Sequence, residues 1–213
     1  GRPGVGKSAF SNQMIFDLLD NDLKEKVIVL YWSFEMPGHQ QILRAGSKDV
    51  KKQVLDLLSV ETKLSEEDYE LYKSKILKYK KYPIHSRLVV GQADSELQRL
   101  NALSKGCMWM QAKMGCINIL LSQLNRNIEQ EHRAKAQYQP LLTDLFGGDS
   151  IGQDAHVVMM LQRPYDLYGI TETYCNEDPI GLLAIHIEKN RDGLLGMIPF
   201  EAEMSTFTIT ERI

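Results

Sequence analysis

Apolar residues recur along this chain in two patterns, at helical spacing in some segments and as continuous runs in others. Residues 7–19 show the helical spacing and predict one helix, which acidic and polar residues end. Residues 37–80 predict three charged, mostly solvated helices, the last with Ser65 as its N-cap. Residues 94–114 predict a further helix.

Continuous apolar runs separate these helices and have the length of strands. They cover residues 26–34, 116–122, 156–161 and 182–187. The first two are typical of strands that helices cover on both faces. Asp192 and Gly193 before the apolar run 194–200 are a hairpin signal. This order predicts an α/β fold with a largely parallel sheet and a C-terminal antiparallel ribbon.

Residues 125–140 show almost no apolar periodicity, which predicts a long mobile loop.

Composition and charge narrow the functional classes. The chain has 213 residues, 43% of them apolar, which fits one large soluble domain. Its net charge of −3 excludes a uniformly basic coat for nucleic acid but not local basic loops. The three cysteines have no CxxC spacing, which fits a reducing cytoplasm. No run reaches the about 18 apolar residues of a membrane span, so we expect no membrane partner.

The opening GRPGVGKS satisfies the phosphate-loop pattern GxxxxGK[ST] with Gly1, Gly6, Lys7 and Ser8, and a predicted helix follows at once. Glycines let the backbone wrap a phosphate, and amides at a helix N-terminus attract the anion. Lys7 is expected to reach the β and γ phosphates of ATP, and the Ser8 hydroxyl to ligate Mg²⁺. The alternative is a glycine-rich turn before an unrelated helix.

Glu35 directly follows the first predicted strand, in the string YWSFEMP. An acid at the carboxyl end of a parallel strand lies at the sheet edge where such folds bind ligands. Glu35 is therefore a candidate base for the water that attacks the γ phosphate. By itself the pattern equally allows a structural carboxylate at the start of a helix.

Five short strings follow one another in the order GRPGVGKS, SFEMP, LLSQLNR, DSIGQDAHVVMML and EKNRDG. Together they resemble the C-terminal ATPase domain of DnaB-type hexameric replicative helicases across nearly the whole chain. The resemblance implies a RecA-like P-loop NTPase fold and an ATP-dependent DNA helicase that acts in replication.

The resemblance also implies roles for single residues. Glu35 corresponds to the catalytic glutamate, and Gln123 to the polar residue that senses the γ phosphate and relays its state to DNA loops. Lys189 and Arg191 correspond to a basic pair that reaches the neighbouring subunit's site, where Arg191 acts as an arginine finger.

The nucleotide-binding residues implied by the motif and the resemblance are Gly1, Pro3, Gly4, Val5, Gly6, Lys7, Ser8, Ala9 and Arg163.

The DNA-facing candidates lie in two segments that line the ring channel in the family. Arg126, Arg133 and Lys135 are candidates for phosphate contacts, and the amides of Gly147 and Gly148 for close approach to the DNA backbone. For Arg133 and Lys135 the alternative is that they merely solvate a loop.

We expect residues 1–213 to form a single RecA-like ATPase domain. The resemblance implies that an N-terminal collar and the first strand lie outside these residues. The family's Mg²⁺-binding strand, the Walker B element, is also missing, because the string IHSRLVVGQAD offers no clean apolar strand ending in Asp. We expect an additional segment near Val90 and Gly91 rather than true loss of the element.

The implied partners are single-stranded DNA, five further copies in a homo-hexamer, and a primase and helicase loader through regions outside these residues. Two alternatives remain open: a RecA- or KaiC-like ATPase without unwinding activity, and a nucleotide-gated ring assembly or loader module. The expected location is the cytoplasm of a bacterial or phage-infected cell.

Overall fold

The computed structural model describes residues 1–23, 27–33, 38–59, 64–88, 96–146 and 149–212. The chain divides into two compact units, which are described separately. Unit 1 comprises residues 1–7, 92–201 and 211–213, and unit 2 comprises residues 8–91 and 202–210.

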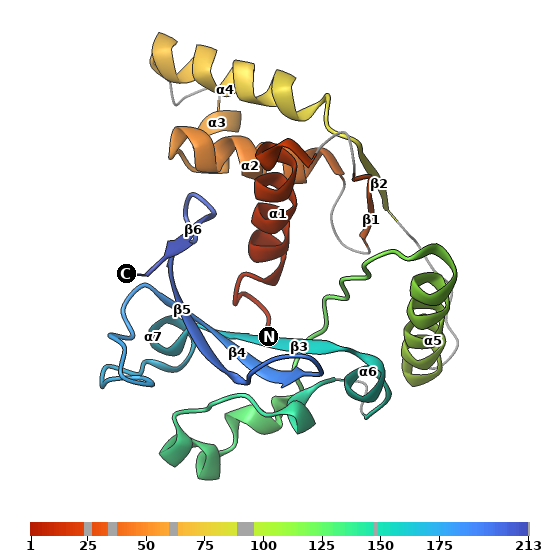
Figure 1. Ribbon diagram of the computed structural model, residues 1–213. Coiled ribbons are helices and arrows are strands. Elements are labelled where there is room, and N and C mark those ends of the chain that lie inside the picture. Colours follow the sequence, from red (N-terminus) through yellow and green to blue (C-terminus); the bar gives the residue numbers. More distant parts are fainter. Residues whose placement is uncertain (24–26, 34–37, 60–63, 89–95, 147–148, 213) are drawn as a thin grey trace. The chain divides into compact units, whose positions relative to one another are not determined.

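Unit 2 is mainly helical and contains one parallel pair of strands (Figure 1). Its helices are α1 (Lys7–Leu18), a π-helical turn (Leu19–Leu23), α2 (Gly38–Val50), α3 (Val54–Leu58) and α4 (Glu66–Tyr79). Strand β1 (Val29–Ser33) pairs in parallel with β2 (Ile84–Leu88), Val29 opposite Ile84. The Ser65 side chain accepts a hydrogen bond from the Asp68 amide, so the predicted N-cap of α4 is confirmed.

Aromatic rings from α1 and α4 form the core of unit 2. Phe16 packs edge-on against Tyr79 with ring centroids 4.5 Å apart, and Tyr82 lies 5.5 Å from Tyr79. The hydroxyl of Tyr79 donates to Asp49, so the one polar atom of this ring is satisfied.

Unit 1 contains two of the antiparallel strands and most of a third. Its helical elements are α5 (Glu96–Met114), three 3-10 helices η2 (Arg126–Glu129), η3 (Glu131–Ala136) and η4 (Leu142–Asp144), and two short helices α6 (Asp149–Asp154) and α7 (Pro164–Tyr168). The strands are β3 (Val157–Gln162), β4 (Leu182–Asn190), β5 (Gly196–Glu203) and β6 (Thr208–Glu211). Residues 202–210, at the end of β5 and in β6, belong to unit 2.

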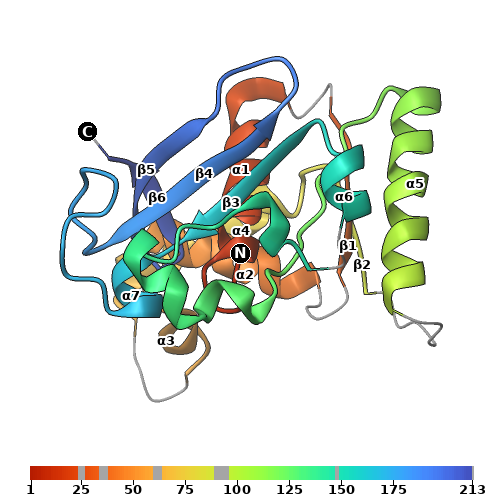
Figure 2. The same ribbon diagram turned by 90° about the horizontal axis from the view of Figure 1, so that it is seen from below.

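Strand β4 is the centre of the sheet in unit 1 (Figure 2). It lies between β3 and β5 and is antiparallel to both. Five consecutive residues of β4, Leu182 to His186, are buried, because both faces of this strand are covered. The predicted hairpin is confirmed, since β4 and β5 flank Asp192 and Gly193 and pair directly.

The α/β class, the helices after residues 6, 37 and 95, and the C-terminal ribbon agree with the sequence prediction. Parallel pairing is seen between β1 and β2 among the described residues. The prediction that strand 26–34 is buried was wrong, because Ile28 and Leu30 are 69% and 54% exposed.

The prediction of a buried strand over residues 116–122 was also wrong. This segment is extended without strand pairing, and Ile117 is 90% exposed. An apolar run becomes a strand only when neighbouring backbone satisfies its amides and carbonyls. At the end of the run such a neighbour is present, where the Gly1 nitrogen donates to Ser122 O at 3.3 Å.

The predicted mobile loop over residues 125–140 is in fact ordered as η2 and η3. Single polar contacts hold it to the unit, among them Arg133 with Asp144 and Gln137 with Thr173 O, so helical periodicity does not reveal it. Among the described residues, no helix is both long and apolar enough to span a membrane.

Candidate nucleotide-binding site

Residues 1–6 form a tight loop that runs directly into α1, which begins at Lys7. Gly4 and Gly6 have φ values of 78° and 101°, a region that favours glycine because it has no Cβ. A Cβ on Gly1 would lie 2.9 Å from the backbone oxygen of Leu161 in β3, so that position also requires glycine. The backbone conformation and the close packing of the loop therefore explain why glycine occupies these positions.

The Lys7 side chain lies across the mouth of this loop. Its ammonium donates to Gly1 O at 2.8 Å and to Arg2 O at 3.1 Å, so the positive charge is held over the loop backbone. Arg163, which follows β3, donates to Gly4 O at 3.4 Å. Two of the predicted nucleotide-binding cations are thus brought to one loop, which is suited to hold an anion.

Gln123 lies beside the first residue of the loop. The Gly1 nitrogen donates to Ser122 O, and the Leu124 amide donates to Gly1 O, both at 3.3 Å. These two bonds bracket Gln123 in the pattern of a parallel strand pair. The Gln123 residue is exposed, so its side chain is available next to the loop where a γ-phosphate sensor is expected.

The remaining predicted nucleotide and metal residues differ in exposure. Val5 and Ala9 are buried, whereas Pro3 is exposed. Ser8 is half-buried on the first turn of α1. A hard cation such as Mg²⁺ takes oxygen ligands and often only one or two from protein, so the Ser8 hydroxyl fits that group. Glu35 lies outside the described residues.

Lys189 and Arg191 lie together at the carboxyl end of α6. The Lys189 ammonium donates to Gly152 O at 2.7 Å and Gln153 O at 2.8 Å, and the Arg191 guanidinium donates to Gln153 O at 3.2 Å. Cations at this position complement the carbonyls at a helix end. Arg191 is exposed, while Lys189 is half-buried.

Arg133 has an internal partner. Its guanidinium makes a two-pronged ion pair with Asp144, with both N–O distances 3.0 Å and side chains 11% and 3% exposed. It also donates to Gln139 O. These contacts favour a structural role over the DNA contact expected from its position in the sequence.

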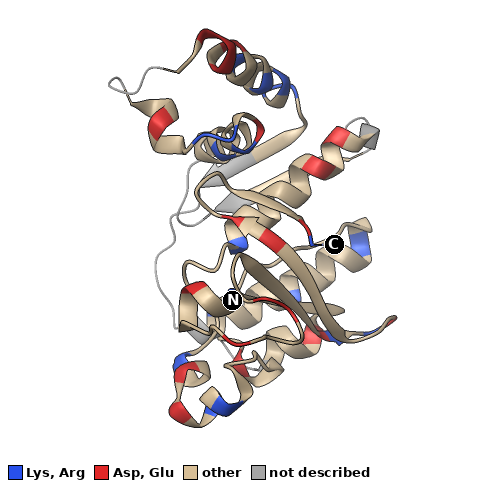
Figure 3. Cartoon of the chain, turned by 90° about the vertical axis from the view of Figure 1, so that its left-hand side faces the viewer, with Lys and Arg blue, Asp and Glu red and all other residues tan. Residues whose placement is uncertain are grey.

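Arg126 and Lys135 are exposed, on η2 and η3 respectively. Figure 3 marks both basic and acidic residues along this part of unit 1. Neither residue has the buried ion pair that holds Arg133, so both stay candidates for phosphate contacts. The other two DNA-binding candidates, Gly147 and Gly148, lie outside the described residues.

A buried polar network that the sequence reading missed joins β3 to the segment 125–140. The Tyr174 hydroxyl donates to Gln162 Oε1 at 2.6 Å and lies 2.8 Å from His186 Nε2. Gln162 Nε2 in turn donates to Gln137 O at 3.2 Å. Burial lowers the pKa of His186 to about 4 and raises the pKa of Tyr174, so both stay neutral near pH 7. No sequence motif signals this network, because its members are far apart in the chain.

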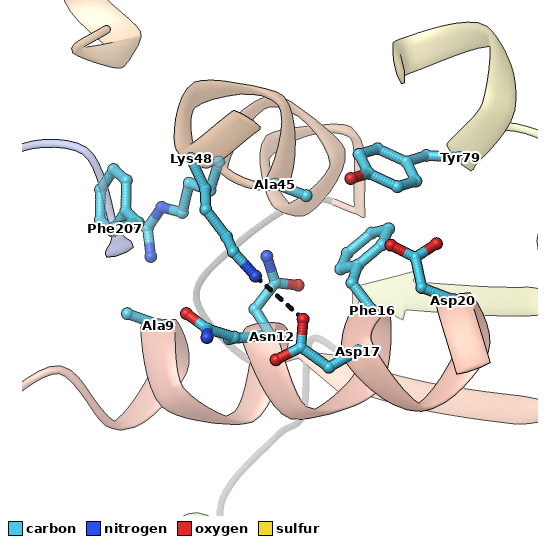
Figure 4. A pocket seen from close by; sticks show the side chains of 11 residues that line it. Ala9, Asn12, Phe16, Asp17, Asp20, Ala45, Lys48, Tyr79 and Phe207 are labelled. Carbon is cyan, nitrogen blue, oxygen red and sulfur yellow. Dashed lines mark hydrogen bonds and ion pairs between the residues drawn. The ribbon is translucent and has the colours of Figure 1, made fainter. Parts of the chain in front are cut away.

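Unit 2 contains a small pocket between α1 and α2 (Figure 4). Phe16 and Tyr79 lie on one side, and the Lys48 ammonium pairs with Asp17 at 2.9 Å across it. Its cavity volume is about 20 Å³, which holds about one water molecule and no nucleotide.

Comparison with known families gives one match over most of the chain. Residues 85–209 match the family described as DnaB-like helicase C terminal domain. The phosphate loop lies before this range, so it is independent of the family match.

Two curated relatives are replicative helicases. The chain is 29% identical to the replicative DNA helicase DnaB of Mycoplasma pneumoniae over 119 residues, which are 55% of this chain and 24% of the relative. It is 25% identical to a probable replicative DNA helicase of Trieres chinensis over 243 residues, which cover 97% of this chain and 51% of the relative. The chain therefore spans about a quarter and about half of these relatives.

Two solved structures share the fold. One, described as an ATPase domain, aligns with a TM-score of 0.84 and 20% identity, covering 100% of this chain and 82% of that one. The other, a DnaB-like replicative helicase studied for its interactions with primase, aligns with a TM-score of 0.83 and 19% identity, covering 100% and 56%. The RecA-like fold expected from the sequence is confirmed.

Proposed function

This chain belongs to the DnaB-like helicase C-terminal domain family, and from that premise we propose that it is the ATP-hydrolysing motor of a replicative DNA helicase. The motor couples hydrolysis to movement along single-stranded DNA and to separation of the duplex. The observation that carries the proposal is the glycine-rich loop. Its Lys7 ammonium bonds to the loop backbone, and Gln123 lies beside its first residue.

Binding of ATP uses the loop residues. The amides of a first helical turn lack intrahelical acceptors and point toward an anion at the N-terminus of α1. The Lys7 ammonium exchanges its bonds to loop carbonyls for bonds to the β and γ phosphates. Ser8 holds Mg²⁺, which when bound neutralises charge on the phosphate oxygens.

Hydrolysis requires a base and a sensor. Glu35 accepts a proton from the attacking water, because a carboxylate at a strand end reaches the γ phosphate in this fold. Gln123 hydrogen-bonds to the γ phosphate and reports its loss to the following segment. Removing the Glu35 carboxylate is expected to stop hydrolysis without stopping ATP binding.

Arg191 acts on the site of a neighbouring copy in a homo-hexameric ring. Charge that develops on the phosphoryl oxygens is stabilised by a cation supplied in trans, an effect of about 10³ to 10⁵ in rate. The exposure of Arg191 supports this role, and the two carbonyl bonds of Lys189 support a role for Lys189 in positioning the strand.

DNA is held by phosphate contacts from Arg126 and Lys135 and by the backbone around Gly147 and Gly148. A motor that moves on any sequence needs contacts to the DNA backbone rather than to bases. Primase and a loader are proposed as partners of the whole protein, in the cytoplasm of a bacterial or phage-infected cell.

The Mg²⁺-binding strand of the family is proposed to lie in an additional segment near Val90 and Gly91, outside the described residues. The alignment with the Trieres chinensis relative supports this, because 243 aligned positions on a 213-residue chain require gaps in this chain. A proteolytic peptide that spans Leu88 to Asp94 and is heavier than this sequence predicts would agree with the proposal, and a peptide of the predicted mass would contradict it.

The proposal is tested by two variants of the protein that carries this sequence. Glu35→Gln is expected to bind ATP with unchanged affinity and to lose hydrolysis; unchanged hydrolysis would refute the assigned base. Arg191→Ala is expected to lose hydrolysis alone but to regain part of it in rings mixed with Glu35→Gln, because each variant supplies what the neighbouring site lacks. Native mass spectrometry with ATP and Mg²⁺ checks for a ring of six copies.

A further inference from the structure

We propose that Arg2, inside the phosphate loop, and Glu129, at the end of η2, form a coupling pair that transmits the state of the loop to residues 125–140. Neither residue belongs to the expected catalytic or nucleotide-binding set. The inference rests on the proposed function, in which residues 125–140 contact DNA. It makes both members positioning residues, since neither touches the reacting atoms.

The contacts of Arg2 run from the loop to η2. Its guanidinium lies 2.6 Å from a Glu129 carboxylate oxygen and donates to Leu124 O at 3.3 Å. The backbone at Gly1 adds the bond from the Leu124 amide. One side chain of the phosphate loop thus holds both the residue before residues 125–140 and the end of their first helix.

Lys7 links the contact between Arg2 and Glu129 to the binding of nucleotide. Its ammonium donates to Arg2 O, on the residue that pairs with Glu129. It also donates to Gly1 O, which accepts from the Leu124 amide as well. A phosphate group competes for the same ammonium protons, because a charged oxygen accepts more strongly than a carbonyl. When Lys7 turns to phosphate, the backbone at Arg2 loses one of its anchors, and the position of the guanidinium changes with it.

Residues 125–140 are held by packing and by an ion pair, so a change at the loop is passed on rather than absorbed locally. Ile128 of η2 is 1% exposed and packs in one cluster with Leu124 and Met160. The Arg133–Asp144 ion pair fixes η3 to η4. Packed elements of this kind shift between discrete arrangements instead of deforming continuously.

The partial exposure of the pair means that its effect on coupling can be measured apart from its effect on stability. The Arg2 side chain is only 17% exposed, but the Glu129 side chain is 45% exposed, so solvent screens the carboxylate and the pair contributes little to folding. Glu129→Gln is therefore expected to leave the melting temperature and the hydrolysis rate without DNA close to those of the parent. What it removes is the charge that links the loop to η2.

The test measures ATP hydrolysis with and without single-stranded DNA in four proteins: the parent, Glu129→Gln, Glu129→Asp and the matched control Glu131→Gln. Glu131 is exposed on η3, two residues further along. Glu129→Gln is expected to lower the stimulation by DNA about fivefold or more. Glu129→Asp, which keeps the charge, should restore part of it, and Glu131→Gln should match the parent.

A double-mutant cycle with Arg2→Gln then identifies the partner. In the Arg2→Gln background, Glu129→Gln is expected to add no further loss of stimulation, because the link is already broken. Full additivity, or a Glu129→Gln protein that is stimulated as strongly as Glu131→Gln, would overturn the coupling pair.

A second readout keeps this outcome distinct from failure of the proposed function. If the parent shows no stimulation by DNA, the proposed function fails, and the pair is judged by amide hydrogen exchange of residues 125–130 with and without ADP. Exchange that responds to ADP in the parent and not in Glu129→Gln supports the pair. An equal response in both proteins contradicts it.

Discussion

The phosphate loop and residues 125–140 show two ways in which sequence encodes structure. The loop is determined locally, because Gly4 and Gly6 adopt backbone conformations that favour glycine. Residues 125–140 depend on distant partners, above all on the ion pair between Arg133 and Asp144. The difference explains why the glycine-rich turn and the helix after it were predicted correctly, whereas residues 125–140 were mistaken for a mobile loop.

The same comparison separates two classes of arginine. Arg133 has its charge satisfied inside the protein, whereas Arg126 on the neighbouring η2 is exposed. Both were candidates for DNA phosphates on sequence grounds. Structure alone distinguishes a cation that builds the segment from one that is available to a ligand.

The largest expected effect comes from breaking the buried ion pair. Arg133→Ala leaves the Asp144 carboxylate, which is 3% exposed, without its cation, and the free energy of unfolding should fall by about 3–5 kcal/mol. Denaturant unfolding measures this. Arg126→Ala is the matched control and should change stability by less than about 0.5 kcal/mol. Equal losses in the two variants would mean that the ion pair does not hold the segment.

Removing the loop cation should have a large effect on rate and little on folding. Lys7→Ala deletes the ammonium that is expected to contact the transferred phosphoryl group, so ATP hydrolysis should fall about 100- to 1,000-fold. Steady-state phosphate release measures this, with Lys135→Ala as a control for loss of one exposed charge. Hydrolysis within about threefold of the parent would refute the role of Lys7 in the transition state.

Acid should weaken the network that anchors residues 125–140. Burial lowers the pKa of His186 from 6.5 to about 4, so the unfolded chain binds a proton between these values while the folded protein does not. Stability is therefore complete above pH 6.5 and falls by about 3 kcal/mol as the pH drops to 4. Unfolding at pH 7, 6, 5 and 4 measures the slope. His186→Gln should flatten this part of the profile, and an unchanged slope would assign the acid sensitivity to other groups.

The smallest effect concerns the backbone of the phosphate loop. Gly4→Ala puts a Cβ on a residue with φ of 78°, at a cost of about 1–2 kcal/mol in stability. Gly106→Ala in α5 is the control, because a Cβ there meets nothing within 4 Å and favours the helix by up to about 1 kcal/mol. Thermal unfolding should show a lower melting temperature for Gly4→Ala and a higher one for Gly106→Ala. A stabilising Gly4→Ala would show that the loop does not need its left-handed residue.

Much of the fold followed from the chain's own patterns. The start of α1 after Gly6, the Ser65 cap of α4 and the turn at Asp192 and Gly193 are local signals, and all three are confirmed. The run at residues 116–122 misled because strand formation depends on neighbours, not on apolar content alone.

The candidate site likewise contains residues that a local motif predicts and contacts that only the fold brings together. Gly1, Gly6 and Lys7 were identified from a motif whose chemistry is local. The contacts of Arg2 with Glu129, and of Gln162 with Tyr174, join residues that no spacing rule brings together. Such pairs become visible only when the fold places their elements side by side.

Strand displacement on a forked DNA duplex tests the central claim most directly. The protein that carries this sequence should separate the strands in the presence of ATP and Mg²⁺, and Lys7→Ala and Glu35→Gln should not. Displacement that stops when ATP is replaced by a non-hydrolysable analogue is the predicted result. ATP hydrolysis stimulated by single-stranded DNA without any strand displacement would contradict it and favour a RecA-like ATPase that does not unwind DNA.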